Sequence, residues 1–239
     1  MRSFRLEHSD HAPFTVLCIG AHCDDIEIGC GGFLVELCGA LPAVDIEWFI
    51  AAAPERRTSE SRRAAARLLK AARAHHIEAH DFTDGELPYA GPALRRSMRA
   101  FAERHRADLV LTHFRDDAHQ DHRFLAELTW QTFRDHLIWE YEIPKYDGDL
   151  ARPNWFVPLE ASTAELKIEC LLECFPSQRE KPWFGAETFR GLMRLRGTEC
   201  RSPSGYAEAF HLRKGLLQLP AITGRPAAGA SRSPSTPST

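Results

Sequence analysis

Residues 14–32, FTVLCIGAHCDDIEIGCGG, decide the fold of this 239-residue chain. The first six of these residues are apolar and partly β-branched, which is typical of a strand buried in a parallel sheet. From Asp25 onward apolar residues recur at helical spacing, and the glycines allow that helix to pass close to the strands or to a ligand. His22, Asp24 and Asp25 lie between the two patterns. The stretch therefore predicts a strand, a short polar turn and a helix.

The same order of elements recurs through the first 135 residues. Strands and helices are expected in alternation: strand 14–19, helix from Asp25, strand 43–50, helix 61–74, strand 76–82, helix 91–105, strand 108–113 and helix 123–134. Such alternation predicts an α/β fold, in which a mostly parallel sheet has helices on both faces. Ligands of such folds bind beyond the carboxyl ends of the strands.

The last third of the chain is less regular. Further strand or helix patterns are present over residues 137–143, 154–158, 164–174, 186–196 and 205–210. From Pro220 onward Pro, Ser, Ala, Gly and Thr dominate without apolar periodicity, which indicates disorder. We therefore expect a flexible N-terminal arm at 1–12, a single α/β domain at 13–219 and a disordered tail at 220–239.

The composition is that of an ordinary globular protein, with 44% hydrophobic residues, 26% charged residues and a net charge of −3. The arginines are scattered among acids on the predicted helix faces, so we expect no nucleic-acid partner. The seven cysteines form no C-x-x-C pair and are expected to be buried thiols in a reducing compartment. Neither a secretory signal nor a run of membrane-span length is visible, so we expect a cytoplasmic chain without membrane insertion. The sequence leaves open whether the chain forms a homo-oligomer.

The turn after the first strand carries the residue types of a metal hydrolase. His22 and Asp25 are three residues apart, so they can face one point and offer one nitrogen and one oxygen to a metal ion. Asp24 would then lie beside the metal and act as general base for a bound water.

A second polar cluster, residues 113–122 (HFRDDAHQDH), begins where another apolar strand ends. His122 opens the next helical pattern and could be the third ligand. His119 would project nearby, where a histidine can stabilise an oxyanion and protonate a leaving amine. Asp121 could orient a histidine by accepting its second N–H. Because both clusters follow the carboxyl ends of strands, we expect them to form one site.

Each cluster also has a simpler interpretation when it is taken alone. Asp24 and Asp25 could cap a helix, and a histidine-rich loop could be a solvated surface. The glycines of 29–32 invite comparison with a dinucleotide-binding loop, but their spacing is not G-x-G-x-x-G and two acids precede them where a pyrophosphate would lie. The occurrence of both clusters at strand ends favours the metal site.

These residues resemble the signatures of the PIG-L (LmbE-like) deacetylases. The segment Ala21–Gly32 is similar to their A-H-P-D-D-x-x-x-G-x-G-G signature, and His119–His122 is similar to their H-x-D-H signature. Further segments that look like family landmarks are Arg57-x-x-Glu60-x-x-x-Ala64, Asp84-Gly85, Ser177-Gln178 and Tyr206–Phe210. The resemblance covers most of the chain. It implies a Rossmann-like fold and the zinc-dependent removal of an acetyl group from N-acetylglucosaminyl compounds or related amides.

The resemblance also implies roles for individual residues. The implied ligands of zinc, or of another divalent metal in its place, are His22, Asp25 and His122. Asp24 would be the general base, and His119 the oxyanion stabiliser and general acid. Asp121 would tune His119, and Arg57 would contact a sugar or its phosphate.

The chain departs from the family pattern at two places. Cys23 replaces the usual proline after the first histidine, and we expect its thiol to point away from His22 and Asp25. Phe175-Pro176 replaces the histidine that is common just before Ser-Gln, so the family's substrate contacts from the last third are not carried over.

The expected partner is a small N-acylated amino sugar or a related amide, bound in a pocket framed by loops 53–59, 84–92 and 144–153. Aromatic residues that could stack on a sugar ring, or pack in the core as the simpler expectation, are Trp139, Tyr141, Trp155 and Trp183. Two other functions stay open at this point. One is an amidase acting on a thiol conjugate or another small amide, and the other is a catalytically silent binding protein that keeps the metal site.

Overall fold

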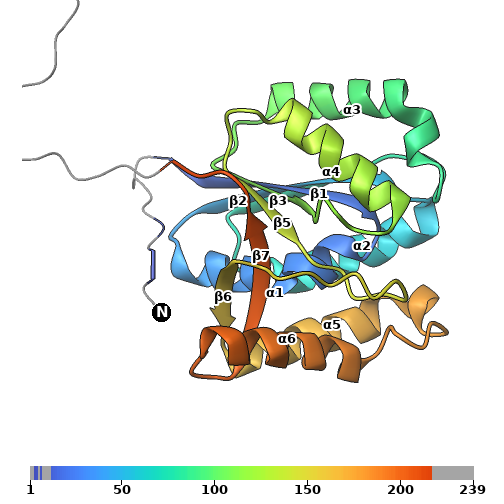
Figure 1. Ribbon diagram of the computed structural model, residues 1–239. Helices are drawn as coiled ribbons and strands as arrows, with labels where there is room; N and C mark the ends of the chain where they lie inside the picture. Colours follow the sequence, from blue (N-terminus) through green and yellow to red (C-terminus); the bar gives the residue numbers. More distant parts are fainter. Residues whose placement is uncertain (1–2, 5, 7–11, 217–239) are drawn as a thin grey trace, which may run out of the picture.

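The computed structural model describes residues 3–4, 6 and 12–216. Most of the expected arm at 1–12 and the whole of the expected tail at 220–239 lie outside the described residues. Within the described part, a seven-stranded sheet of order β3-β2-β1-β4-β5-β7-β6 lies between two layers of helices (Figure 1). This arrangement confirms the predicted α/β fold.

Five neighbouring strands of the sheet are parallel. They are β1 (Phe14–His22), β2 (Val44–Ala52), β3 (Ala74–Ala79), β4 (Leu109–His113) and β5 (Ile138–Tyr141). At one edge β7 (Tyr206–Leu212) is antiparallel to β5, and β6 (Trp155–Leu159) is antiparallel to β7. The antiparallel edge comes from the last third of the chain, where the sequence pattern is least regular.

Helices cover both faces of the sheet (Figure 1). One face carries α3 (Gly91–Arg104) and α4 (Gln120–Thr132), with the short helix η1 (Leu87–Ala90) before α3. On the other side lie α1 (Asp25–Ala40), α2 (Glu55–Leu68), α5 (Ala161–Cys174), η2 (Pro176–Gln178) and α6 (Ala186–Cys200). None of the helices in the described part is both long and apolar enough to cross a membrane.

The first strand is buried on both faces, as the apolar run predicts. Val16 and Cys18 pack in the core on the α1 side, and Leu17 and Ile19 pack in the core on the α3 and α4 side. Successive side chains of a strand point to opposite faces, so one continuous apolar run can supply both cores.

The chain order reverses between β1 and β4. From β1 the chain moves outward to β2 and β3, and it then returns to place β4 on the other side of β1. At such a reversal the helices after the two strands go to opposite faces and leave a crevice at the carboxyl ends. β1 ends at His22 and β4 ends at His113, so both polar clusters lie at this crevice.

Both predicted ends of the second helix are wrong. The sequence reading places a pocket loop at 53–59 and the helix at 61–74, whereas α2 runs from Glu55 to Leu68 and β3 begins at Ala74. Pro54, with φ −59° and ψ 148°, directly precedes the helix, and the Thr58 hydroxyl donates to the Ala53 carbonyl at 2.8 Å. Arg57 therefore projects from the first turn of a helix, which fixes its position more firmly than a loop would.

Candidate metal centre

The turn after β1 brings the side chains of His22 and Asp25 close to each other. Asp24 has φ 104° and ψ −25°, a left-handed conformation that costs a non-glycine residue roughly 1–3 kcal/mol. The backbone N–H of His22 donates to Asp25 Oδ2 at 2.7 Å, which closes the turn. As a result His22 Nδ1 lies 3.4 Å from Asp25 Oδ2.

His122, from the first turn of α4, completes a buried triangle of ligand atoms. Its Nε2 lies 3.3 Å from His22 Nδ1 and 3.5 Å from Asp25 Oδ1. Ligand atoms about 2.0–2.1 Å from a tetrahedral zinc are about 3.3 Å apart. The closest approaches of the three side chains are near this value, although His22 and His122 approach different oxygens of Asp25. Each of these residues is at most 7% exposed. The two nitrogens and a carboxylate oxygen could therefore hold a metal ion.

The outer nitrogen of each histidine is held by carboxylates. His22 Nε2 lies 3.1 Å from Asp121 Oδ2 and 3.0 Å from Asp84 Oδ1. His122 Nδ1 lies 3.1 Å from Asp117 Oδ2. Carboxylates at this position fix the ring orientation of a metal-binding histidine and increase its basicity.

Asp121 lies against His22 and touches His119 only through its backbone. Its carboxylate also accepts the N–H groups of Gly85 at 2.7 Å and Leu87 at 3.1 Å, which lock it in place. Its own N–H donates to His119 Nδ1 at 3.2 Å. The resemblance implies that Asp121 tunes His119, but the histidine that its carboxylate contacts is His22, and it acts on His119 only by raising its pKa through its charge.

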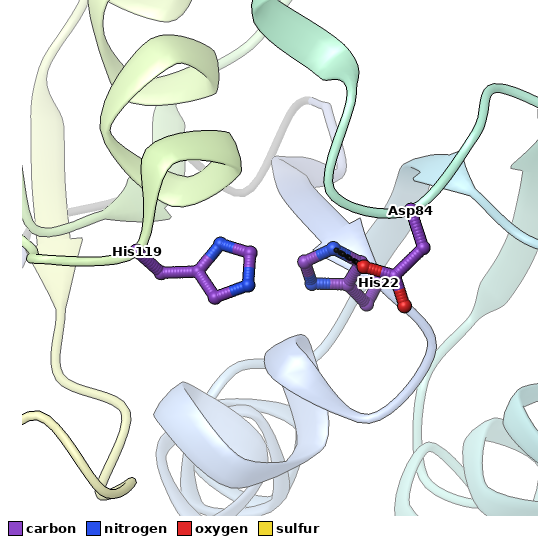
Figure 2. Close-up of side chains that lie close together, drawn as sticks. All are labelled: His22, Asp84 and His119. Atoms are coloured by element: carbon purple, nitrogen blue, oxygen red, sulfur yellow. Dashed lines mark ion pairs between the residues drawn. The ribbon is translucent and has the colours of Figure 1, made fainter.

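His119 lies across the site from Asp84 (Figure 2). Its ring meets His22 edge-on at 5.1 Å and stacks on His122 at 4.5 Å, measured between ring centroids. Burial lowers the pKa of His119, and the neighbouring charge of His22 lowers it further. His119 is half-buried, so it lines the outer side of the triangle rather than its interior.

Asp24 points to a different partner from Asp25. Arg57 Nη2 lies 2.9 Å from Asp24 Oδ1 and also donates to the Cys23 carbonyl. Burial raises the pKa of Asp24 to about 7, against the opposing charge of Arg57. Burial acts in the same direction on Asp25, but His122 and His113 hold the pKa of Asp25 well below its usual range.

Two groups of the site have no role in the sequence reading. Asp117 holds His122, and its other oxygen lies 3.1 Å from Lys145 Nζ. His113 ends β4, accepts the Ala21 N–H at 2.9 Å and stacks on His122 at 4.0 Å. Asp117 and His113 belong to the second cluster, so their position after a strand was a usable signal. Lys145 lies in no recognisable motif.

Cys23 points away from the triangle. Its thiol is fully buried, and burial raises its pKa to about 12. Among the described residues it belongs to none of the groups that could hold a metal ion. A neutral, enclosed thiol of this kind is an inert packing group.

The fold is shared with several solved structures of low sequence identity. The conserved protein TT1542 from Thermus thermophilus is 21% identical with a TM-score of 0.67, over 87% of this chain and 98% of that one. The N,N'-diacetylchitobiose deacetylase from Pyrococcus horikoshii is 20% identical with a TM-score of 0.63, over 83% of each chain. GalB, the 4-carboxy-2-hydroxymuconate hydratase from Pseudomonas putida KT2440, is 15% identical with a TM-score of 0.64, over 87% of this chain and 100% of that one. Because a hydratase shares the fold, the fold alone does not select the reaction.

No curated protein sequence matches this chain. Residues 17–133 match the family described as PIG-L, GlcNAc-PI de-N-acetylase. The matched segment contains both polar clusters, Arg57 and Asp84. This segment, which carries the whole candidate centre except Lys145, is what the chain has in common with the PIG-L family.

Proposed function

We propose that the protein is a metal-dependent amide hydrolase that removes an N-acyl group, in the first place an acetyl group, from an amino sugar or glycoconjugate. The observation that carries this proposal is the buried triangle of His22, Asp25 and His122 with a second carboxylate, Asp24, beside it. The match of residues 17–133 to a de-N-acetylase family supports the same reaction class.

Zinc is the metal that the donor set favours. Two imidazole nitrogens and one carboxylate oxygen are a ligand set of catalytic zinc sites, which keep one position open. When bound, the ion would polarise the substrate carbonyl and lower the pKa of a water molecule. The short distances of 3.3 Å between the two histidine nitrogens and of 3.4 and 3.5 Å from them to the two oxygens of Asp25 support this assignment.

Asp24 is the proposed proton acceptor. It is 5% exposed and belongs to none of the ligand groups, so its carboxylate stays free to take the proton of the attacking water. Arg57 at 2.9 Å holds that carboxylate in one orientation. Any contact of Arg57 with a sugar or phosphate would therefore come from a guanidinium that already pairs with the proposed base.

His119 is the proposed oxyanion stabiliser and general acid. The water oxygen bonds to the acyl carbon, the C–N bond breaks, and the departing nitrogen takes a proton from His119. A free amine and a carboxylate result. Asp121 and Asp84 are positioning residues, because they hold His22 rather than the reacting atoms.

The test measures acetate release by the zinc-loaded protein across N-acetylated amino sugars, acyl thiol conjugates and simple N-acyl amides. We expect release from an amino sugar, loss of release after chelation, and recovery on stoichiometric zinc. Release only from thiol conjugates would favour the amidase alternative. A protein that binds zinc and releases no carboxylate from any of these compounds would contradict the hydrolase assignment and favour a silent binding protein.

A further inference from the structure

Two loops outside the family match lie at the same end of the molecule as the metal centre. Residues 144–150 follow β5, and residues 179–185 connect η2 to α6 (Figure 1, yellow and orange, on the right). The first loop is tied by Lys145 to Asp117, and the second follows η2, in which Ser177 is tied to Glu60 of α2. The loops bring the exposed ring of Tyr146 and the half-buried ring of Trp183 together.

The first loop is anchored beside His122. Lys145 Nζ lies 3.1 Å from Asp117, the carboxylate that holds His122, and 2.6 Å from Asp149. Asp149 also accepts the N–H of Ala118 at 2.6 Å. Tyr146 follows Lys145 directly in the chain and is 71% exposed. The ring of Tyr146 is thus presented to solvent from a backbone fixed at the edge of the centre.

The second loop is anchored beside Arg57. Glu60 is one turn after Arg57 on α2, and it accepts the N–H of Ser177 at 3.1 Å and the hydroxyl of Ser177 at 2.5 Å. The N–H of Lys181 donates to the Gln178 carbonyl at 3.0 Å, which holds the start of the loop against η2. Lys181 therefore follows a segment that is held to α2 one turn after Arg57.

The two loops meet ring to ring. The centroids of Tyr146 and Trp183 are 6.5 Å apart, with ring planes at 83°. Lys181 Nζ lies 5.7 Å from the centroid of Trp183. Among the described residues no carboxylate pairs with this ammonium, so it keeps an unneutralised charge.

Trp183 differs from the other aromatic residues that the sequence reading considered for stacking. Trp139 and Tyr141 are buried in the core, and Trp155 packs against Phe4 at 5.6 Å. Trp183 is half-buried, and its neighbours are an exposed tyrosine and an exposed lysine. A rigid aromatic ring next to a free cation suits a ligand that has both a ring face and a negative charge.

We propose that Tyr146, Trp183 and Lys181 form a specificity subsite that takes the ring on the amine side of the substrate, and that this ring carries an anionic group. The subsite rests on the proposed function, because it assumes that the N-acyl group lies at the metal centre. The ring would pack on Trp183 and Tyr146, and the anionic group would pair with Lys181.

The test measures binding without turnover, on Asp24→Asn protein loaded with zinc. Calorimetric titrations with N-acetylglucosamine and with N-acetylglucosamine 1-phosphate give a Kd for the neutral and the charged ring. We expect the phosphate to bind more tightly. Adding Trp183→Ala should raise both Kd values about tenfold. Adding Lys181→Gln should raise only the Kd of the phosphate, by about tenfold.

Two matched control substitutions are available. Leu195→Ala removes another exposed apolar side chain, which is 50% exposed on α6, and Lys70→Gln removes another exposed ammonium, just after α2. Both should leave each Kd within about twofold. The subsite would be overturned if the test and control variants lost affinity equally. It would also be overturned if the wild-type subsite bound the phosphate no more tightly than the neutral sugar, or bound neither sugar.

Failure of the subsite and failure of the proposed function give different results. With Asp24 restored, acetate release by Trp183→Ala should show a raised KM and a nearly unchanged kcat. Acetate release combined with wild-type affinities in the variants would contradict the subsite alone. The expected affinity changes without any acetate release would contradict the hydrolase and leave the subsite in place.

Discussion

At the scale of residues, the centre depends on two adjacent carboxylates in opposite surroundings. Asp25 faces three histidines, which hold its pKa well below its usual range, whereas burial raises the pKa of Asp24 to about 7 beside Arg57. The kink at Asp24, with φ 104°, turns the two side chains toward different partners. Because their surroundings shift the two pKa values in opposite directions, one of these adjacent carboxylates can serve as metal ligand and the other as base.

Asp24→Asn should retain zinc and lose turnover. Asparagine tolerates the left-handed backbone and has nearly the same shape, but it accepts no proton. We expect kcat to fall by about 10²–10⁴-fold at unchanged metal content, measured by acetate release and elemental analysis. As a comparison, His22→Ala should lose both metal and turnover. Activity of Asp24→Asn close to that of wild type would remove Asp24 from the role of base.

Two neighbouring aspartates provide a matched pair for the support of His122. Asp117 lies 3.1 Å from His122 Nδ1, whereas Asp116 pairs with Arg213 at 2.9 Å, away from the histidines. Asp117→Asn should weaken zinc affinity about 10–100-fold, because the ligand loses its orienting carboxylate. Asp116→Asn should leave zinc affinity unchanged. Competition titrations with a zinc chelator measure both values, and equal affinities in the two variants would contradict the role of Asp117.

At the scale of elements, α1 is held by the buried ion pair of Glu208 and Lys167, which hydrogen-bonds to the backbone of the helix. Glu208 accepts the N–H of Gly32 at 2.8 Å and of Phe33 at 2.6 Å, and Lys167 Nζ donates to the Ile28 carbonyl at 2.5 Å and to Glu208 at 2.6 Å. A Cβ at Gly32 would lie 2.9 Å from Glu208 Oε1. The glycine is therefore required by the close approach of this carboxylate.

Removal of Lys167 should destabilise the protein strongly. Lys167→Met leaves Glu208 buried without its cation, and breaking a buried pair in this way costs about 3–5 kcal/mol. The solvent-accessible pair of Arg190 and Glu165 is the control, and Arg190→Met should change the free energy of unfolding far less than Lys167→Met does. Urea unfolding of both zinc-free variants measures the difference. Equal free energies of unfolding would show that the buried pair is not needed.

At the scale of the whole molecule, most of the strand positions and the proposed metal ligands could be predicted from the sequence. Apolar runs mark β1, β2 and β4, because parallel strands are buried on both faces. His22, Asp25 and His122 could be grouped because their two clusters begin at the carboxyl ends of β1 and β4. The start of α2 was missed because Glu55 to Ser59 is polar throughout and only Pro54 indicates the boundary.

Other features depend on contacts that no local pattern encodes. Lys145, which pairs with Asp117, comes from a separate loop after β5. The place of β7 between β5 and β6 is likewise decided by long-range packing, since strand patterns carry no pairing information. Sequence reasoning therefore recovers the proposed ligands better than the residues that support them.

Acid should weaken the fold through His211, away from the metal centre. Burial and the charges of Arg213 and Arg196 lower the pKa of His211 to about 4, whereas its pKa in the unfolded chain is about 6.5. The unfolded chain therefore binds a proton that the folded chain excludes. This stabilising contribution is complete above about pH 6.5 and is lost as the pH falls toward 4.

The prediction is tested by comparing wild type with His211→Asn. Between pH 7.5 and pH 5 the free energy of unfolding of wild type should fall by about 1–2 kcal/mol more than that of the variant. Urea unfolding of zinc-free protein at both pH values measures this difference. Parallel losses in the two proteins would show that His211 does not contribute to the pH dependence.

The central claim is that one metal ion lies between the two polar clusters, at the triangle of His22, Asp25 and His122. A crystal grown with stoichiometric zinc and measured at the zinc absorption edge tests it directly. We predict one anomalous peak about 2.0–2.2 Å from His22 Nδ1, His122 Nε2 and an oxygen of Asp25. A peak at one of the two other histidine and aspartate groups, His113 with Asp117 and His122 or His22 with Asp84 and His119, would contradict the account, as would no peak.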